Sequence, residues 1–305
     1  MIFQNYFGEI AALITAVFWT ITAIFFELAG KRIGSLQVNI LRLTFAFIIL
    51  SIFNYFYRGL FFPTDATSFQ WFWLFISGLV GFVFGDLFLF QAYVIIGARV
   101  SMLIMALAPF FSAIAGWLIL GEALSLKILL GMFVTFLGIV LVVLGRPVKD
   151  GKVNGRFSVG FKHNSLGLLY ALGGALGQGL GLVLSKYGMQ DYDPFASSQV
   201  RIIAGILGFS TIIFFSNRWK ILIDSLKETR AITYTTLGAI FGPFLGVSFS
   251  LLAVQHTSAG IAATLMSIVP ILIIAPAVLI FKEKISVKEI LGAVITSVGV
   301  AIFFI

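Results

Sequence analysis

Asp86 is the residue of this sequence best placed to do chemistry, because it is a carboxylate inside an apolar stretch. A charge at the centre of a bilayer costs roughly 3 kcal/mol or more, so such a residue needs a partner or a function. Phe82, Phe90 and Tyr93 share its predicted helical face. The carboxylate suits three roles that the sequence leaves open: binding a substrate amine, carrying a coupling proton, or pairing with a structural arginine.

Arg42 and Arg201 are the second pair of candidates, and they stand near the starts of two predicted membrane helices. One interpretation has them reach the membrane interface or pair with carbonyl groups at helix ends. The other makes them two basic groups near the two mouths of a central pathway. Residue type and position allow both interpretations.

Trp19 and Gln178 align with each other when the two halves of the sequence are superimposed. A polar side chain in lipid is costly, so we expect Gln178 to face protein or water. An aromatic ring such as Trp19 suits the wall of a pocket for a flat or cationic solute.

Pro109 and Pro270 are predicted to lie within apolar spans, at equivalent positions of the two halves. Proline has no backbone N–H and kinks a helix. Paired interruptions of membrane helices in corresponding positions indicate a transport site, so both prolines are candidate hinges.

Four further charged residues are predicted at helix ends. Glu122 and Glu283 suit either a gate or the charge preference of a helix terminus. Glu27 and Lys186 occupy equivalent positions with opposite charge, and we interpret them as markers of helix ends.

Other kinds of chemistry find no support in the sequence. There is no Ser/His/Asp grouping, no HExxH motif and no cysteine, and His163 and His256 lie too far apart to predict a metal site. The glycines between 173 and 181 lie inside an apolar span and predict close helix packing rather than a phosphate loop. We therefore predict neither an enzyme nor a cofactor or metal.

The composition is that of a membrane protein. Of 305 residues, 60% are hydrophobic and 10% are charged, and the mean hydropathy is +1.09. A soluble domain carries about 25% charged residues. Stretches long enough to cross a bilayer predict ten helices, at roughly 9–29, 36–57, 71–94, 99–120, 127–145, 165–185, 194–215, 231–253, 258–281 and 287–305.

The sequence is also an internal repeat. Residues 1–145 and 165–305 match each other with an offset of 159 to 161 positions, and a basic, glycine-containing connector, 146–164, joins them. Five helices per half place the second half upside down relative to the first. Such inverted repeats commonly surround a central site in transporters.

The distribution of basic residues predicts how the chain is oriented in the membrane. Apart from Arg58, Lys127 and Lys186, the lysines and arginines of the connectors follow odd-numbered predicted helices. The positive-inside rule places those connectors in the cytoplasm and both termini outside, most simply in the plasma membrane. This distribution also explains the net charge of +8 without nucleic acid as a partner. Residues 1–9 lack the basic start of a signal peptide, so we expect the first helix to be retained.

One recurring pattern resembles a known family. In both copies a small residue and proline precede an apolar run, a glutamate, a serine and two glycines seven positions apart: Ala108, Pro109, Glu122, Ser125, Gly131 and Gly138, then Val269, Pro270, Glu283, Ser286, Gly292 and Gly299. The pattern is similar to the EamA repeat of the drug/metabolite transporter superfamily. The resemblance implies a basket of ten helices around a cavity lined near Trp19, Asp86, Phe90, Tyr93, Met105, Pro109, Gln178, Phe249, Met266 and Pro270.

The resemblance further implies a secondary transporter that moves a small metabolite by alternating access, for example an exporter of an amino acid or a related solute. The alternatives are proton-coupled efflux of drugs or cations and, from another class, a membrane scaffold or receptor that transports nothing. The expected partners are a small-molecule substrate and the lipid bilayer. Whether the protein is a monomer or a homodimer stays open.

Overall fold

The structure is a computed structural model that describes residues 6–145, 165–272 and 286–302, and every regular element in these residues is helical. The first half forms α2 (Phe7–Ile33), α3 (Ser35–Arg58), α4 (Ser68–Gly78), η1 (Leu79–Gly85), α5 (Asp86–Met105), α6 (Ala108–Ala115), η2 (Gly116–Leu120) and α7 (Leu126–Gly145). The second half forms α8 (Ser165–Met189), α9 (Pro194–Phe215), α10 (Trp219–Ser225), α11 (Thr229–Ala239), η3 (Ile240–Gly246), α12 (Val247–His256), α13 (Ala259–Met266), α14 (Val269–Leu272) and α16 (Val287–Ala301). The predicted connector 146–164 and the end of the ninth predicted span, with Glu283, lie outside the described residues.

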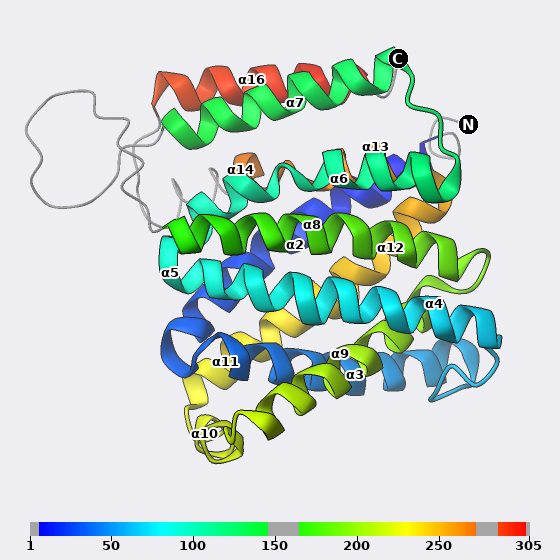
Figure 1. Cartoon of the computed structure of the whole chain (residues 1–305), viewed down its shortest axis with the longest axis vertical. Coiled ribbons are helices and arrows are strands. Elements are labelled where there is room, and N and C mark those ends of the chain that lie inside the picture. Colours follow the sequence, from blue (N-terminus) through cyan, green and yellow to red (C-terminus); the bar gives the residue numbers. More distant parts are fainter. Residues whose placement is uncertain (1–5, 146–164, 273–285, 303–305) are drawn as a thin grey trace, which may run out of the picture.

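Within these residues, six helices are long and apolar enough to cross a membrane: Phe7–Ile33, Ser35–Arg58, Ser68–Ile96, Ser165–Met189, Pro194–Phe215 and Thr229–His256. Three shorter apolar helices accompany them, and Figure 1 shows the long helices running side by side. The prediction of an all-helical membrane protein is confirmed, while the number of ten crossings stays a prediction.

Local sequence signals set the helix boundaries. Asp193 caps α9 by accepting a hydrogen bond from the Ala196 N–H at 2.9 Å, and Pro194 follows at the first helical position. Ser125 caps α7 in the same way, because its hydroxyl accepts a hydrogen bond from the Ile128 N–H at 3.3 Å. Gly59 ends α3 with a φ of +75°, a conformation that favours glycine.

The fourth and ninth predicted spans are broken rather than continuous. The first break is the turn at residues 106–107 between α5 and α6, and the second is at residues 267–268 between α13 and α14. The two breaks stand 161 positions apart, as do Pro109 and Pro270 just after them. A proline fits the first turn of a helix, where its missing N–H is not needed. The expectation that these residues kink one helix is corrected: each stands at the start of a new helix.

The third and eighth predicted spans share another irregularity. Both contain a π-helical segment, η1 in the first half and η3 in the second, and the two segments occupy equivalent positions. Each π-helical turn contains about one residue more than an α-helical turn. The side chains that follow it therefore point in directions shifted by about one position. Asp86 and Val247, the residues directly after the π segments, are therefore counterparts in structure as well as in sequence.

The two halves pack against each other through equivalent helices. The first helix of each half, α2 or α8, packs along the third span of the other half: α2 on α11, η3 and α12, and α8 on α4, η1 and α5. Likewise α3 packs on α9, and α7 packs on α16 in a layer of its own at the edge of the bundle (Figure 1). This reciprocity is the structural counterpart of the sequence repeat.

Glycines allow these contacts. A Cβ added at Gly177 would stand 2.5 Å from the Cα of Gly85, and one at Gly181 would stand 2.8 Å from the Cα of Gly81. Real Cβ atoms do not approach so closely, so the predicted packing role of the glycines in α8 is confirmed.

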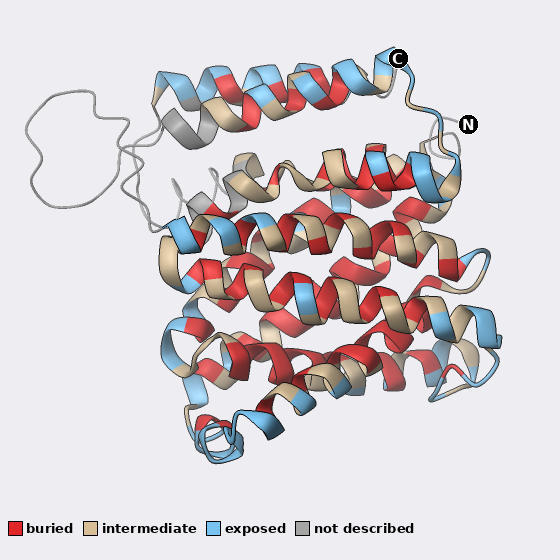
Figure 2. Cartoon of the chain, in the orientation of Figure 1, coloured by how far each residue is buried: buried red, intermediate tan, exposed pale blue. Residues whose placement is uncertain are grey.

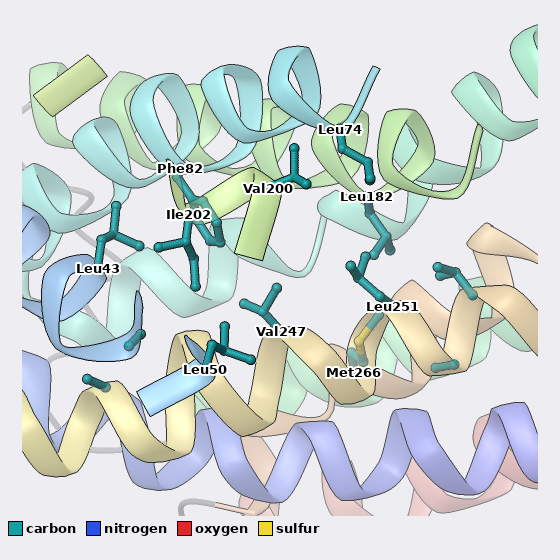
Figure 3. Packing of buried hydrophobic residues seen from close by; sticks show 14 of the residues in the cluster. Leu43, Leu50, Leu74, Phe82, Leu182, Val200, Ile202, Val247, Leu251 and Met266 are labelled. Atoms are coloured by element: carbon teal, nitrogen blue, oxygen red, sulfur yellow. The ribbon is translucent and has the colours of Figure 1, made fainter. Parts of the chain in front are cut away.

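The most buried side chains lie between the long helices, whereas α7 and α16 expose much of their outer surface (Figure 2). The main cluster joins residues from both halves, and Figure 3 shows Leu182, Leu251 and Met266 from α8, α12 and α13 close together. The many exposed leucine, isoleucine and phenylalanine side chains of the surface suit a lipid environment.

Candidate functional site: a cavity between the halves

A cavity of about 140 Å³ lies between the two halves, a volume that suits a small molecule rather than a polymer. Its wall takes residues from helices of both halves: Trp19, Thr22, Ala23, Phe26, Arg42, Phe82, Asp86, Leu89, Phe90, Tyr93, Met105, Ala106, Ala108, Gln178, Gly179, Leu182, Arg201, Gly242, Pro243, Val247, Ser250, Ala263, Met266, Ser267 and Val269. The cavity therefore gathers most of the site residues predicted from sequence, Trp19, Asp86, Phe90, Tyr93, Met105, Gln178 and Met266 among them.

Asp86 lies at the centre of a polar network on this wall and is only 4% exposed. One of its carboxylate oxygens pairs with the Arg42 guanidinium, and the other accepts a hydrogen bond from the Gln178 amide at 2.5 Å. Asn39 accepts from the Arg42 Nε at 3.0 Å. Of the three roles considered for Asp86, the observed geometry matches pairing with an arginine.

Arg42 is held by aromatic rings as well as by Asp86. Its guanidinium carbon lies 4.6 Å from the centre of the Phe90 ring and 5.3 Å from that of Phe26. Such contacts between a cation and a ring face are favourable, most of all away from water. Arg42 therefore neither reaches the membrane interface nor marks one mouth of a pathway, because it is buried in the central cavity.

Arg201, the repeat counterpart of Arg42, lines the same cavity and is also 4% exposed. Its guanidinium carbon lies 4.8 Å from the centre of the Phe82 ring. Its buried Nε has no hydrogen-bond partner, and the side chain forms no ion pair with any described residue. The two arginines thus share one cavity and one nearby carboxylate rather than standing at opposite mouths.

Phe249 is a predicted cavity residue that the structure places elsewhere. Its ring packs 5.6 Å from that of Phe18 and 6.4 Å from that of Phe195. Val247 and Ser250, three positions apart on α12, face the cavity instead. Residues three apart on a helix share a face, and the two residues between them, Ser248 and Phe249, point away from it.

The broken helices open onto the cavity. Met105 and Met266, four residues before Pro109 and Pro270, both line it. Since a proline has no N–H, neither of their carbonyl groups can receive the usual helical hydrogen bond from four residues on. Pro109 is itself buried behind this wall, and the side chain of Pro270 lies outside the described part of the chain.

Several residues of the cavity wall were not predicted from the sequence. Phe26, Pro243, Ser250 and Ser267 line the cavity, yet none was among the predicted site residues. Asn39 was missed as well, although a polar residue three positions before a buried arginine on one helix is a signal that spacing could have supplied.

A second polar cluster ties the halves together near the ends of α6, α8 and α12. The Lys186 ammonium contacts Glu122 at 2.6 Å and donates to the Thr257 carbonyl at 2.7 Å. Glu122 also accepts from the Ala259 N–H at 2.9 Å, which caps the start of α13. Glu122 of the first half thus contacts both α8 and α13 of the second half. We call the pair Glu122 and Lys186 the latch.

Chemistry of other kinds finds no support in the described residues. No group of three or more histidine, cysteine, aspartate or glutamate side chains there is arranged to hold a metal ion. Among the described residues, the ionisable side chains on the cavity wall are Arg42, Asp86, Arg201 and Tyr93. The wall can bind and orient a solute, and it carries a net positive charge.

Comparison with known proteins supports the same picture. The chain is 26% identical over 136 residues to a Bacillus subtilis (strain 168) protein named uncharacterized transporter YoaV, a match covering 44% of this chain and 46% of that protein. It is 24% identical over 183 residues to an uncharacterized transporter of Clostridium kluyveri, covering 60% and 56%. The matched region thus spans about half the length of these relatives.

A solved crystal structure shares the fold, with a TM-score of 0.72 and 16% identity over 98% of this chain and 96% of that one. The EamA-like transporter family, a family of transporters rather than enzymes within the drug/metabolite transporter superfamily, matches residues 6–144 and again residues 165–305. Two matches that together cover nearly the whole sequence establish that the chain belongs to the EamA-like transporter family.

Proposed function

We propose that this protein is a secondary transporter that moves a small metabolite, such as an amino acid or a related solute, by alternating access. The main support is the cavity between the halves, whose wall contains a broken helix from each half at equivalent positions. In membrane transporters, interrupted helices occur where the backbone lines a substrate site.

The proposed architecture is two inverted five-helix repeats with ten crossings. The reciprocal packing of equivalent helices supports it, because contacts of this kind are those expected for two repeats related by a pseudo-two-fold axis. The breaks near Pro109 and Pro270 are the proposed hinges. The distribution of basic residues supports a plasma-membrane location with both termini outside.

Proton-coupled efflux of bulky cations receives less support. Asp86 is the only acidic side chain that the described part of the chain places on the cavity wall, and Arg42 and Gln178 already occupy both its oxygens. A cation entering this cavity would meet two arginines and a neutralised carboxylate. The charge of the wall therefore favours solutes that are neutral or negative overall.

The latch offers a direct test of alternating access. The sequence has no cysteine, so Glu122→Cys with Lys186→Cys supplies the only two thiols. Because a Lys–Glu pair that touches at its tips leaves the two backbones too far apart for a direct disulfide, the thiols are joined with a bifunctional methanethiosulfonate reagent. In proteoliposomes loaded with a mixture of metabolites, we expect counterflow of at least one labelled solute by the unlinked variant. Cross-linking should stop the flux by fixing one end closed, and dithiothreitol should restore it.

Each single-cysteine variant is the matched control and should keep its flux when treated with the same cross-linking reagent. Undiminished flux through a fully cross-linked protein would contradict alternating access. The absence of counterflow for every solute tested, by the wild type as well, would contradict transport itself and favour the scaffold or receptor hypothesis.

A further inference from the structure

Arg42 and Arg201 occupy equivalent positions of the two halves, but their surroundings differ at the residue that follows the π-helical segment. Each lies on the second helix of its half, 159 positions from the other. Arg42 faces Asp86, the residue directly after η1, whereas the residue directly after η3 is Val247. The first half thus supplies a carboxylate to its arginine, and the second half supplies a methyl-bearing side chain in the same place.

Arg201 is therefore a buried cation without a carboxylate partner like the one that Asp86 provides for Arg42. It is only 4% exposed, its Nε has no hydrogen-bond partner among the described residues, and it lines the cavity. A buried charge without a partner is strongly unfavourable, and buried polar atoms almost always find one. An oxyanion entering the cavity would supply this partner, because a guanidinium presents its N–H groups in a fork that matches a carboxylate.

The charge of the wall limits what that anion can be. Arg42, Asp86 and Arg201 together leave one positive charge, which a monoanion balances. Most of the remaining wall is apolar or aromatic, with Trp19 and Phe82 among its rings. A solute with one carboxylate and a compact apolar body matches both the charge and the surface.

We infer that Arg201 binds the carboxylate of the transported solute, and that this solute is a small organic monoanion with an apolar body. This inference rests on the proposed transport function and names its substrate class. Asp86 then has a defined part: with Gln178 it holds Arg42, so that one arginine is structural and the other is available to the ligand.

The test is thermal stability of the full-length protein in detergent, measured against ligands that share one shape. Benzoate is the probe, with benzamide as the neutral match, benzylamine as the cation and phenyl phosphate as the dianion. A ligand that binds only the folded protein raises the melting temperature in a saturable way. We expect benzoate to do so, and the other three compounds to bind at least about tenfold more weakly.

Two variants assign the effect to Arg201. Arg201→Gln should weaken benzoate binding about a hundredfold, the loss typical of truncating one side of a buried charge pair. Arg201→Lys should recover part of it, since the charge remains but the fork is lost.

Val247→Asp is the sharper variant, because it recreates the partner that Arg42 already has. An aspartate there should pair with Arg201, keep the protein folded and exclude benzoate. Monodisperse elution on size exclusion and a melting temperature at or above that of the wild type would show that the fold is intact. This variant keeps the test valid even where Arg201→Gln does not fold.

Benzoate binding by Val247→Asp as tight as by the wild type would overturn the inference. Tighter binding of phenyl phosphate, benzamide or benzylamine than of benzoate would overturn it too. If proteoliposomes carry a neutral or cationic solute and no monocarboxylate, the substrate class is wrong while the transport proposal stands. Absence of any flux refutes the transport proposal instead.

Discussion

Arg42 and Asp86 form an ion pair whose side chains are each only 5% exposed, and they join the second and third predicted spans of the first half inside the central cavity. Taking two charges out of water is costly, so such a pair adds little net stability. Removing one member is different, because the remaining charge is left buried and unpaired.

Asp86→Asn should therefore destabilise the protein by about 3–5 kcal/mol. This loss of stability comes from the Arg42 charge, which the variant leaves buried and unpaired. The double variant Asp86→Asn with Arg42→Gln should recover much of it, since no unpaired charge remains. Thermal unfolding in detergent measures both, and equal melting temperatures for Asp86→Asn and the wild type would contradict the prediction.

Glu122→Gln should weaken the latch while leaving an oxygen for the Ala259 N–H. The Lys186 ammonium then loses its ion pair, and the population should shift toward a state open at that end. Ser250→Cys, on the buried cavity wall, reports the shift through its rate of labelling by a membrane-impermeant maleimide. We expect faster labelling with Glu122→Gln present, and an unchanged rate would show that the latch does not control access.

Gly177→Ala should separate α8 from η1, because the new Cβ would stand 2.5 Å from the Cα of Gly85. We expect a loss of more than about 1 kcal/mol, as for other overpacked sites. Gly30→Ala is the matched control: nothing lies within 4 Å of its added Cβ, and alanine in a helix is favoured over glycine by about 0.5–1 kcal/mol. The two variants should move the melting temperature in opposite directions.

The loop before α4 should give stability a measurable dependence on pH. Burial opposes ionisation of Asp65, but the hydrogen bond from Tyr192 and the charge of Arg58 outweigh it and hold the Asp65 pKa below its usual value. A carboxyl group with a lowered folded-state pKa stabilises the fold above the unfolded-state pKa, near 4. That contribution disappears as the pH falls through the folded-state pKa.

Asp65→Asn should therefore lower the melting temperature at pH 6 and have progressively less effect as the pH is lowered below 4. Paired melting curves of wild type and variant between pH 3 and pH 6 measure this difference. A constant difference across the range would mean that Asp65 does not contribute through its charge.

Much of the fold was predictable because it depends on composition and repetition. Apolar length identified the long spans, and the offset between the halves located both prolines and both arginines. The pairing of Arg42 with Asp86 was not predictable, because 44 positions separate them and only helix packing brings them together. Once the halves are aligned, however, Val247 opposite Asp86 already signals that Arg201 lacks an equivalent partner.

The misplaced Phe249 has a physical cause in η3. An α-helical period puts Phe249 two turns after Gly242, a residue that does line the cavity. The π-helical segment between them delays the rotation, so Val247 and Ser250 take that face instead. No periodicity in the sequence announces such a segment; Pro243 lies within η3, yet η1 has Phe82 at the same position.

The packing of α7 on α16 bears on how the two halves hold together. A Cβ added at Gly138 would stand 2.5 Å from the backbone nitrogen of Thr296, and one at Gly299 would stand 2.5 Å from that of Thr135. Gly138 and Gly299 are repeat counterparts, as are Thr135 and Thr296. The glycine of each half therefore packs against the threonine of the other half. A surface of this kind is complementary to itself. Two separate half-length chains of this kind would therefore pair with each other through the same contacts that hold the two halves of this one together.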